Sequence, residues 1–162
     1  MNWKVLNTSE ALENLAKRRV QTPMVAKVFY SSWMQGITTD PCLMMAPLDD
    51  HLVHRGDGVF EAMRFEQGGI YLWKAHWDRL NTSAGVIGLS LPLQSQEMLG
   101  LLRNMIRVSG LKQGLIRIFL ARGPGGFTVN PYDSKESQFY IIISELRLPS
   151  EEQYKAGVSV CT

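Results

Sequence analysis

The alternating side chains of residues 59–66 constrain the fold of this chain more than any other feature. Successive side chains of a β-strand point to opposite faces of a sheet, so this segment predicts a strand with two different faces. One face would carry Phe60, Ala62 and Arg64, and the other Glu61, Met63 and Phe65. The composition of residues 67–69 then predicts a hairpin turn, and residues 70–72 a return strand.

A helix is predicted directly after this hairpin. Apolar side chains recur at steps of four, three, four and three residues, which is the spacing of one helical face. These side chains are Trp73, Trp77, Leu80, Ala84 and Ile87. We expect this face to be buried and Gly88 to cap the C-terminus of the helix. Arg79 lies beside Leu80, on the flank of the apolar face.

The rest of the chain predicts further helices and strands in turn. Helix-cap patterns and helical spacing predict helices at residues 9–19, from Ser95 to Gly110, and at residues 151–156. Runs of β-branched and aromatic residues predict strands at residues 25–30, 115–120 and 138–144, and a further strand that begins at residues 158–161. The predicted fold class is α+β: a small two-layer domain whose mostly antiparallel sheet is flanked by helices.

The composition describes an ordinary globular domain and excludes several classes of function. The chain has 162 residues, enough for one sizeable core, and its net charge of +2 is too small to indicate a nucleic-acid partner. No apolar run is long enough for a membrane span, and the N-terminus lacks the apolar segment of a signal peptide. The two cysteines form no Cys-x-x-Cys motif, which argues against a zinc site and a disulfide scaffold. This cysteine usage suits a reducing compartment, so a cytoplasmic location is expected.

Arg79 has two possible interpretations. A guanidinium at the edge of a buried face is costly to leave without an anionic partner. The partner could be a carboxylate, from Asp78, Asp57 or Glu61. It could also be a bound phosphate, which the fork of an arginine fits better than a lysine does.

Two glycine-rich segments invite a similar comparison. Residues 56–58 (Gly-Asp-Gly) could let the backbone approach a ligand, but they do not form the dinucleotide-binding pattern. Residues 123–126 lack the lysine of a nucleotide-binding P-loop. Taken singly, both segments are better explained as hairpin loops.

Several motifs in order along the chain carry a family resemblance. They are residues 36–41 (Gly-Ile-Thr-Thr-Asp-Pro), residues 49–51 (Asp-Asp-His), residues 54–56 (His-Arg-Gly) and residues 76–80 (His-Trp-Asp-Arg-Leu). Together they resemble the class IV family of pyridoxal-phosphate-dependent aminotransferases, and the first three are especially similar to its D-amino-acid aminotransferase and aminodeoxychorismate lyase branch. The resemblance covers nearly the whole chain and is densest from Gly36 to Pro92.

The resemblance implies roles for six residues of this chain. Arg79 matches the arginine that holds the phosphate of pyridoxal 5'-phosphate, so we favour the phosphate over the salt bridge. Phe60, Ala62 and Arg64 match positions that line the substrate pocket. Arg122 matches an arginine that receives the substrate carboxylate in some members, and Arg117 matches the alternative used in the branched-chain group. Because these two lie five residues apart, we expect opposite orientations, with at most one reaching the site.

The family chemistry also requires a lysine that forms a Schiff base with the cofactor aldehyde and then acts as a base. None of the seven lysines here lies at the matching position, so no catalytic residue is predicted within the chain. The resemblance therefore implies that residues 1–162 form the small N-terminal domain of such an enzyme, with the catalytic-lysine domain outside them. It also implies a homodimer that acts on an amino acid and a keto acid.

Three hypotheses for function follow. The first is a transaminase, and Glu61 with Arg64 three residues later favours it. The second is aminodeoxychorismate lyase, which uses the same cofactor to eliminate pyruvate and release 4-aminobenzoate. The loop at residues 122–126 fits this branch somewhat better than the branched-chain group. The third is an inactive domain that only self-associates, because a lone copy would expose the apolar surface of its missing half.

Overall fold

A six-stranded antiparallel sheet forms the centre of the molecule, in the order β2-β1-β6-β5-β3-β4. The computed structural model describes residues 3–21 and 25–160. The strands are β1 (Ala26–Ser31), β2 (Gly36–Thr38), β3 (Gly58–Glu66), β4 (Gly69–Ile70), β5 (Gln113–Ala121) and β6 (Gln138–Ser144). The helices are α1 (Thr8–Gln21), α2 (His51–Arg55), α3 (Trp73–Val86), α4 (Ser95–Ser109) and α5 (Glu151–Ala156), with 3₁₀ turns η1 (Pro41–Leu43) and η2 (Pro131–Asp133).

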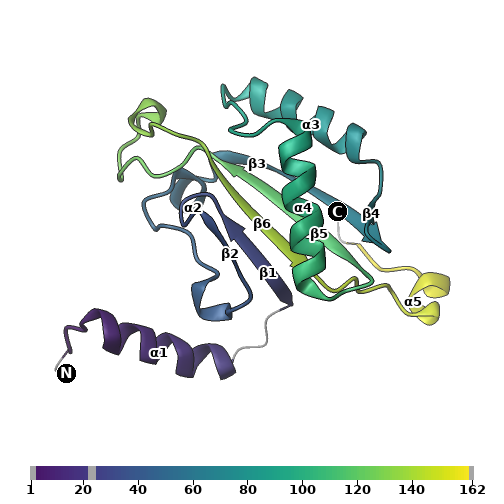
Figure 1. Cartoon of the computed structure of the whole chain (residues 1–162), viewed down its shortest axis with the longest axis horizontal. Helices are drawn as coiled ribbons and strands as arrows, with labels where there is room; N and C mark the ends of the chain where they lie inside the picture. The colour runs from purple at the N-terminus through teal and green to yellow at the C-terminus, as the bar shows by residue number, and fades with distance from the viewer. Residues whose placement is uncertain (1–2, 22–24, 161–162) are drawn as a thin grey trace.

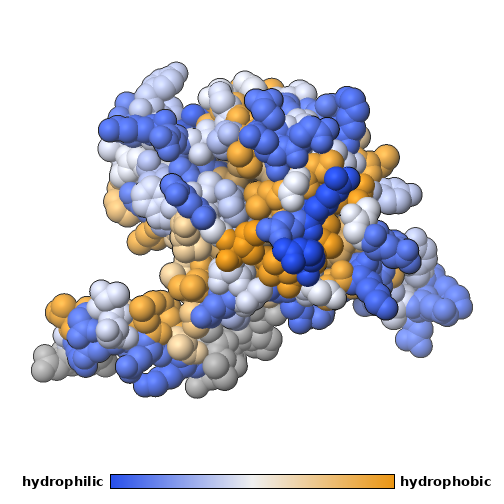
Figure 2. All heavy atoms as spheres, viewed as in Figure 1, coloured by the Kyte–Doolittle hydropathy of each residue, from blue (hydrophilic) through white to orange (hydrophobic). Residues whose placement is uncertain are grey.

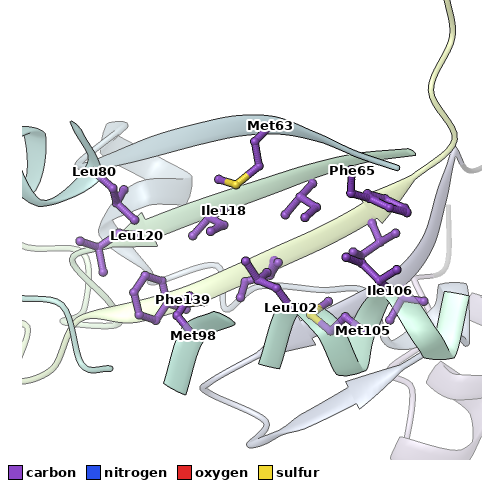
Figure 3. Close-up of a cluster of buried hydrophobic side chains, with 14 of the residues drawn as sticks. Met63, Phe65, Leu80, Met98, Leu102, Met105, Ile106, Ile118, Leu120 and Phe139 are labelled. Atoms are coloured by element: carbon purple, nitrogen blue, oxygen red, sulfur yellow. The ribbon is translucent and has the colours of Figure 1, made fainter. Parts of the chain in front are cut away.

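Helices α3 and α4 cover one face of the sheet (Figure 1). Helix α3 packs against β3, and α4 lies across β1 and β6. The main core fills the space between these helices and the sheet, where side chains from β3, β5, β6 and α4 point toward one another (Figure 3). Its largest fully buried members include Phe65, Phe139, Leu102 and Met105. This face is the two-layer part of the predicted α+β fold, which the structure confirms.

The opposite face of the sheet is covered only in part. A smaller cluster of Phe29, Met44, Ala121 and Tyr140 lies there, beneath the segment that contains η1 and α2. Toward β3 the cover ends, and the side chain of Phe60 is 65% exposed. We call this side the open face of the sheet.

Helix α1 lies apart from the sheet, near η1 (Figure 1). The side chains of its residues 8–18 contribute nothing to either buried cluster, and Leu12 is 46% exposed. On the side seen in Figure 2, hydrophobic residues also lie on both sides of the hydrophilic stripe on α4. The helix predicted at residues 9–19 is therefore present as α1, although none of its residues 8–18 is fully buried.

Several predicted boundaries differ from the structure. The return strand β4 ends at Ile70, because Leu72 adopts a left-handed conformation with φ of 48° as the N-cap of α3. The N-cap of α4 is Gln94 instead of Ser95, and its amide donates to Glu97. The strand predicted from residue 158 is wrong for residues 158–160, which are irregular; Cys161 lies outside the described residues.

Two short elements were not predicted. Helix α2 was missed because five residues are too few for a helical period, and strand β2 because its three residues lie in a segment with turn composition. Within residues 3–21 and 25–160, no helix has the length and apolar character needed to cross a membrane.

Replacing Leu102 with alanine tests the main core. Leu102 is fully buried on α4, so Leu102→Ala removes apolar contacts and leaves a cavity. We expect the free energy of unfolding to fall by about 3 kcal/mol, measured by urea denaturation. The control is Leu48→Ala at a position that is 70% exposed, where we expect a change below about 0.5 kcal/mol. Equal effects at both positions would contradict the placement of Leu102 in the core.

Candidate functional site

Strand β3 presents two chemically different faces, as its alternation predicted. Glu61, Met63 and Phe65 are buried toward α3 and α4, at 2%, 2% and 0% exposure. Phe60 and Arg64 point to the open face and are exposed. The antiparallel register with β5 places Phe60 opposite Phe119 and Ala62 opposite Arg117. The strand therefore divides the predicted site residues between two sides of the sheet.

Arg79 forms a two-pronged salt bridge with Glu61. Its Nε lies 2.5 Å from Oε1 of Glu61, and its Nη2 lies 2.5 Å from Oε2. His76, one helical turn before Arg79, brings its Nδ1 within 2.7 Å of the same Oε2. The salt bridge to Glu61, one of the two interpretations from the sequence, is therefore present. Whether Arg79 also binds phosphate stays a prediction.

The three side chains of this cluster differ widely in exposure. The Glu61 side chain is 2% exposed and that of His76 is 19% exposed, whereas that of Arg79 is 64% exposed. Because a carboxylate can only accept, Nδ1 of His76 must carry hydrogen and donate to Glu61. Nδ1 then cannot accept from Nη2 of Arg79, which lies 3.3 Å away. Among the described residues, no partner reaches Nη1 of Arg79, so its outer edge is free to bind an anion.

Two opposing influences determine the pKa of Glu61. Burial penalises the charged carboxylate and by itself raises its pKa. The hydrogen bonds and positive charges of Arg79 and His76 outweigh burial, so the pKa of Glu61 lies below its ordinary value. The same contact raises the pKa of Arg79. Glu61 is therefore ionised at neutral pH, and Arg79 pairs with its buried negative charge.

Phe60, Arg64 and Arg117 come together on the open face of the sheet. The rings of Phe60 and Phe119 stack with centroids 6.0 Å apart. Arg117 has one weak contact, at 3.4 Å from Nη1 to Oγ of Ser144. Arg64 donates to Glu66 at 2.8 Å on the exposed edge. Neither arginine has a buried anionic partner among the described residues.

The open face also carries an apolar hollow of about 240 Å³. Its lining comes from β1, β5, β6 and the segment that contains η1 and α2: Phe29, Met44, Met45, Ala46, Leu52, Phe119, Tyr140 and Ile142. At its wall the hydroxyl of Tyr140 donates to the buried carboxylate of Asp50 at 2.6 Å. Burial and this negative charge raise the pKa of Tyr140, which stays neutral.

Arg122 has a different environment from the other arginines. Its Nε donates to Asp57 at 2.6 Å, and its Nη2 donates to the carbonyl of Ile87 at the C-terminal end of α3. The side chains of Arg122 and Asp57 are 13% and 23% exposed. Arg122 lines a separate hollow of about 440 Å³, between residues 88–92 and 131–137. The structure thus brings Arg117, and not Arg122, beside Phe60 and Arg64.

The two groups of residues meet at one edge of the sheet. Strand β4 pairs with β3 only at Phe65 and Glu66, so the described residues include no second partner strand for β3 before these residues. Arg79 and Glu61 lie on the helix side of this edge, and Phe60, Arg64 and Arg117 lie on the open side. The edge at residues 58–64 therefore lies between the two groups, with Glu61 on its helix side and Phe60 and Arg64 on its open side.

The two glycine-rich segments both lie beside α2. Gly56 ends α2 in a left-handed conformation, with φ of 69°. The loop after β5 is bound to the N-terminal end of α2 by a hydrogen bond from the His51 amide to the Gly123 carbonyl, and to the segment before α2 by one from the Gly125 amide to the Asp49 carbonyl. The imidazole of His51 is fully buried beneath this loop. This burial was not predicted from the sequence, because it depends on the unpredicted helix α2. In residues 3–21 and 25–160, no group of three His, Cys, Asp or Glu side chains could hold a metal ion.

The acid stability of the protein should depend on Glu61. A carboxylate with a lowered folded-state pKa contributes stability above its ordinary pKa near 4.5, and this contribution is lost as pH falls through the folded-state value. Glu61→Gln should therefore be less stable than the parent at pH 7, with a gap that narrows below pH 4.5. Thermal unfolding between pH 7 and pH 3 measures this gap. Glu13→Gln, on exposed α1, is the control, and a pH-independent gap for Glu61→Gln would contradict the prediction.

The two arginines at β5 should differ in their effect on stability. Arg122→Met leaves Asp57 partly buried without its cation and Ile87 without its donor, so we expect a loss of about 2 kcal/mol in the free energy of unfolding. Arg117→Met removes one long contact and should cost less than about 1 kcal/mol. Urea denaturation of both variants makes the comparison. A larger loss for Arg117→Met would show that these roles are reversed.

Comparison with known proteins identifies the family. The profile described as amino-transferase class IV matches residues 58–162. The D-amino-acid transaminase, chloroplastic, of Arabidopsis thaliana is 37% identical over 142 residues, which are 88% of this chain and 38% of that protein. A putative branched-chain-amino-acid aminotransferase of Methanocaldococcus jannaschii is 34% identical over 108 residues, 66% of this chain and 38% of that protein. The chain thus spans well under half the length of these relatives.

Solved structures share the fold at lower identity. The branched-chain aminotransferase of the archaeon Thermoproteus uzoniensis, solved with norvaline, superposes with a TM-score of 0.65 at 19% identity, covering 75% of this chain and 41% of that chain. A putative 4-amino-4-deoxychorismate lyase from Legionella pneumophila has a TM-score of 0.61 at 22% identity, covering 66% of this chain and 39% of that one. With the profile match over residues 58–162, the chain belongs to the class IV aminotransferase family.

Proposed function

We propose that this chain is the N-terminal domain of a pyridoxal-phosphate-dependent aminotransferase, which transfers an amino group between an amino acid and a keto acid. One observation carries the proposal above all. An exposed arginine, Arg79, is fixed by the buried carboxylate of Glu61 and keeps one edge of its guanidinium free. Such a group is suited to hold a phosphate at the protein surface.

The residues present fit the phosphate end of the cofactor. Nη1 of Arg79 has two N–H donors with no partner among the described residues, and phosphate oxygens are strong acceptors. Glu61 does not block phosphate binding at Nη1 of Arg79. Its two oxygens accept from Nε and Nη2 of Arg79 and from Nδ1 of His76 instead. When bound, pyridoxal phosphate serves as the electron sink and amino-group carrier of the reaction.

The open face is proposed to contact the substrate. The rings of Phe60 and Phe119 and the apolar hollow offer contacts for an apolar side chain. Arg64 and Arg117 supply positive charge on the same face, without buried anions of their own among the described residues. We assign the substrate carboxylate to Arg117 in preference to Arg122, because Asp57 and the end of α3 already occupy Arg122.

The rest of the machinery is proposed to lie outside these 162 residues. No lysine of the chain matches the family's catalytic position, and the relatives are more than twice as long as the matched segment. We therefore propose a second domain that supplies the lysine, in a homodimer. A cytoplasmic location is proposed from the cysteine usage, since the two cysteines form no Cys-x-x-Cys motif.

Cofactor binding should depend on Arg79. The protein in its natural length should show the visible absorption band of bound pyridoxal phosphate and transfer an amino group from an amino acid to a keto acid. Arg79→Gln removes the phosphate contact, so the cofactor affinity should fall about tenfold or more. Spectroscopic titration measures this affinity. The matched control is Arg103→Gln, on the exposed side of α4, which should bind the cofactor normally.

Two results would contradict this function. Absence of both the absorption band and amino transfer would exclude a working pyridoxal-phosphate enzyme. Release of pyruvate and an aromatic amine, without amino transfer, would replace the transaminase by the aminodeoxychorismate lyase that shares the fold. Testing D- and L-amino acids in parallel then defines the stereochemistry.

A further inference from the structure

We infer that Glu61 is a positioning residue, which orients the guanidinium of Arg79 toward a bound phosphate, and that His76 fixes Glu61 in this role. The inference rests on the proposed function, because it needs a phosphate at Arg79. It gives a role in phosphate binding to two residues that were not among the site residues predicted from the sequence. Neither residue is proposed to touch the phosphate.

The first support is the unequal burial of the two partners. Glu61 is 2% exposed, whereas Arg79 is 64% exposed. Among the lysine and arginine salt bridges of the described residues, every other pair has two exposed partners or two largely buried ones. A buried carboxylate is costly in itself, and an exposed salt bridge contributes little stability. The arrangement makes sense if its benefit is the fixed direction of the exposed group.

The second support is the way in which the contact is made. Glu61 occupies Nε and Nη2, which are the inner edge of the guanidinium, and leaves Nη1 outside. A two-pronged contact fixes the plane of the guanidinium, which a single hydrogen bond would not do. An arginine held in this way loses less side-chain entropy when it binds an anion, because the ordering has occurred before binding.

The third support is the contact between His76 and Glu61. Nδ1 of His76 donates to Oε2, the oxygen that also accepts from Nη2 of Arg79. The carboxylate is thus held from α3 at two points one helical turn apart, and it cannot rotate away without losing both. The strand backbone holds Glu61 from the other side, since β3 pairs with β5 along its whole length. The cluster is therefore held by two elements, α3 and β3, and Nη1 of Arg79 has no partner among the described residues.

The test compares the affinities for pyridoxal 5'-phosphate and for pyridoxal, which lacks the phosphate. The protein in its natural length is titrated with each compound, and quenching of fluorescence from Trp73 and Trp77 on α3 reports binding. The ratio of the two dissociation constants isolates the contribution of the phosphate. A variant that merely loosens the fold weakens the binding of both compounds by the same factor and leaves the ratio of dissociation constants unchanged. Circular dichroism verifies that each variant is folded.

We expect Glu61→Gln to reduce the preference for the phosphorylated compound about tenfold. Arg79→Gln should reduce it at least as much, and the double variant Glu61→Gln/Arg79→Gln no further than Arg79→Gln alone, because Glu61 acts only through Arg79. Asp78→Asn removes one negative charge next to Arg79 without touching its guanidinium, since Asp78 pairs with Lys74. The preference of this control should equal that of the parent.

Each result distinguishes the positioning role from the proposed function. If the parent binds both compounds equally, the phosphate site itself is wrong. If Arg79→Gln abolishes the preference but Glu61→Gln retains it, the phosphate site stands and the positioning role of Glu61 is wrong. Additive losses in the double variant, or an equal loss in Asp78→Asn, also overturn that role. Should Glu61→Gln not fold, His76→Gln replaces it in the same cycle, with the same outcomes expected in the same direction.

Discussion

The continuous pairing of β3 with β5 is the interaction on which the rest of the structure depends. Nine residue pairs, from Gly58 with Ala121 to Glu66 with Gln113, lie in one unbroken antiparallel register. A shift of one residue would exchange the two faces of β3, which would bury Arg64 and expose Phe65. Close packing at both ends opposes such a shift. A Cβ on Gly58 would lie 2.6 Å from the Leu120 carbonyl, and one on Gly114 would lie 2.5 Å from the ring of Phe65.

This register explains why four arginines of one small domain have such different environments. The face parity of β3 places Glu61 beneath α3, so Arg79 receives a buried partner. The same parity places Arg64 and Arg117 on the open face, where the described residues offer no buried carboxylate. Arg122 lies just after the last pair of the register and turns toward Asp57. The differences among these arginines therefore arise from the pairing of the strands, and only secondarily from their neighbours in sequence.

Patterns that repeat within one element were predicted well from the sequence. The alternation of β3, the apolar stripe of α3 and the buried side of α4 all match the structure, because each follows from the local period of a strand or helix. The site was less predictable. Glu61 was one of three candidate partners for Arg79, and choosing among them requires the packing of α3 on β3. The contrast between Arg117 and Arg122 likewise depends on the position of Asp57, which no local period determines.

The glycine-rich loop after β5 has two possible explanations, one from ligand binding and one from packing. Its glycines could be attributed to a ligand, yet backbone conformation and packing already explain Gly123 and Gly125. A Cβ on Gly125 would lie 3.0 Å from Nε2 of the buried His51 and 2.7 Å from the Ser134 amide, and Gly123 has φ of 100°, where other residues are strained. This packing keeps the loop against α2, and the Arg122 contact to Asp57 joins that unit to β3. The glycine-rich motifs thus stabilise the scaffold from which β3 presents its edge, whereas the charged side chains on either side of that edge are the groups suited to bind a ligand.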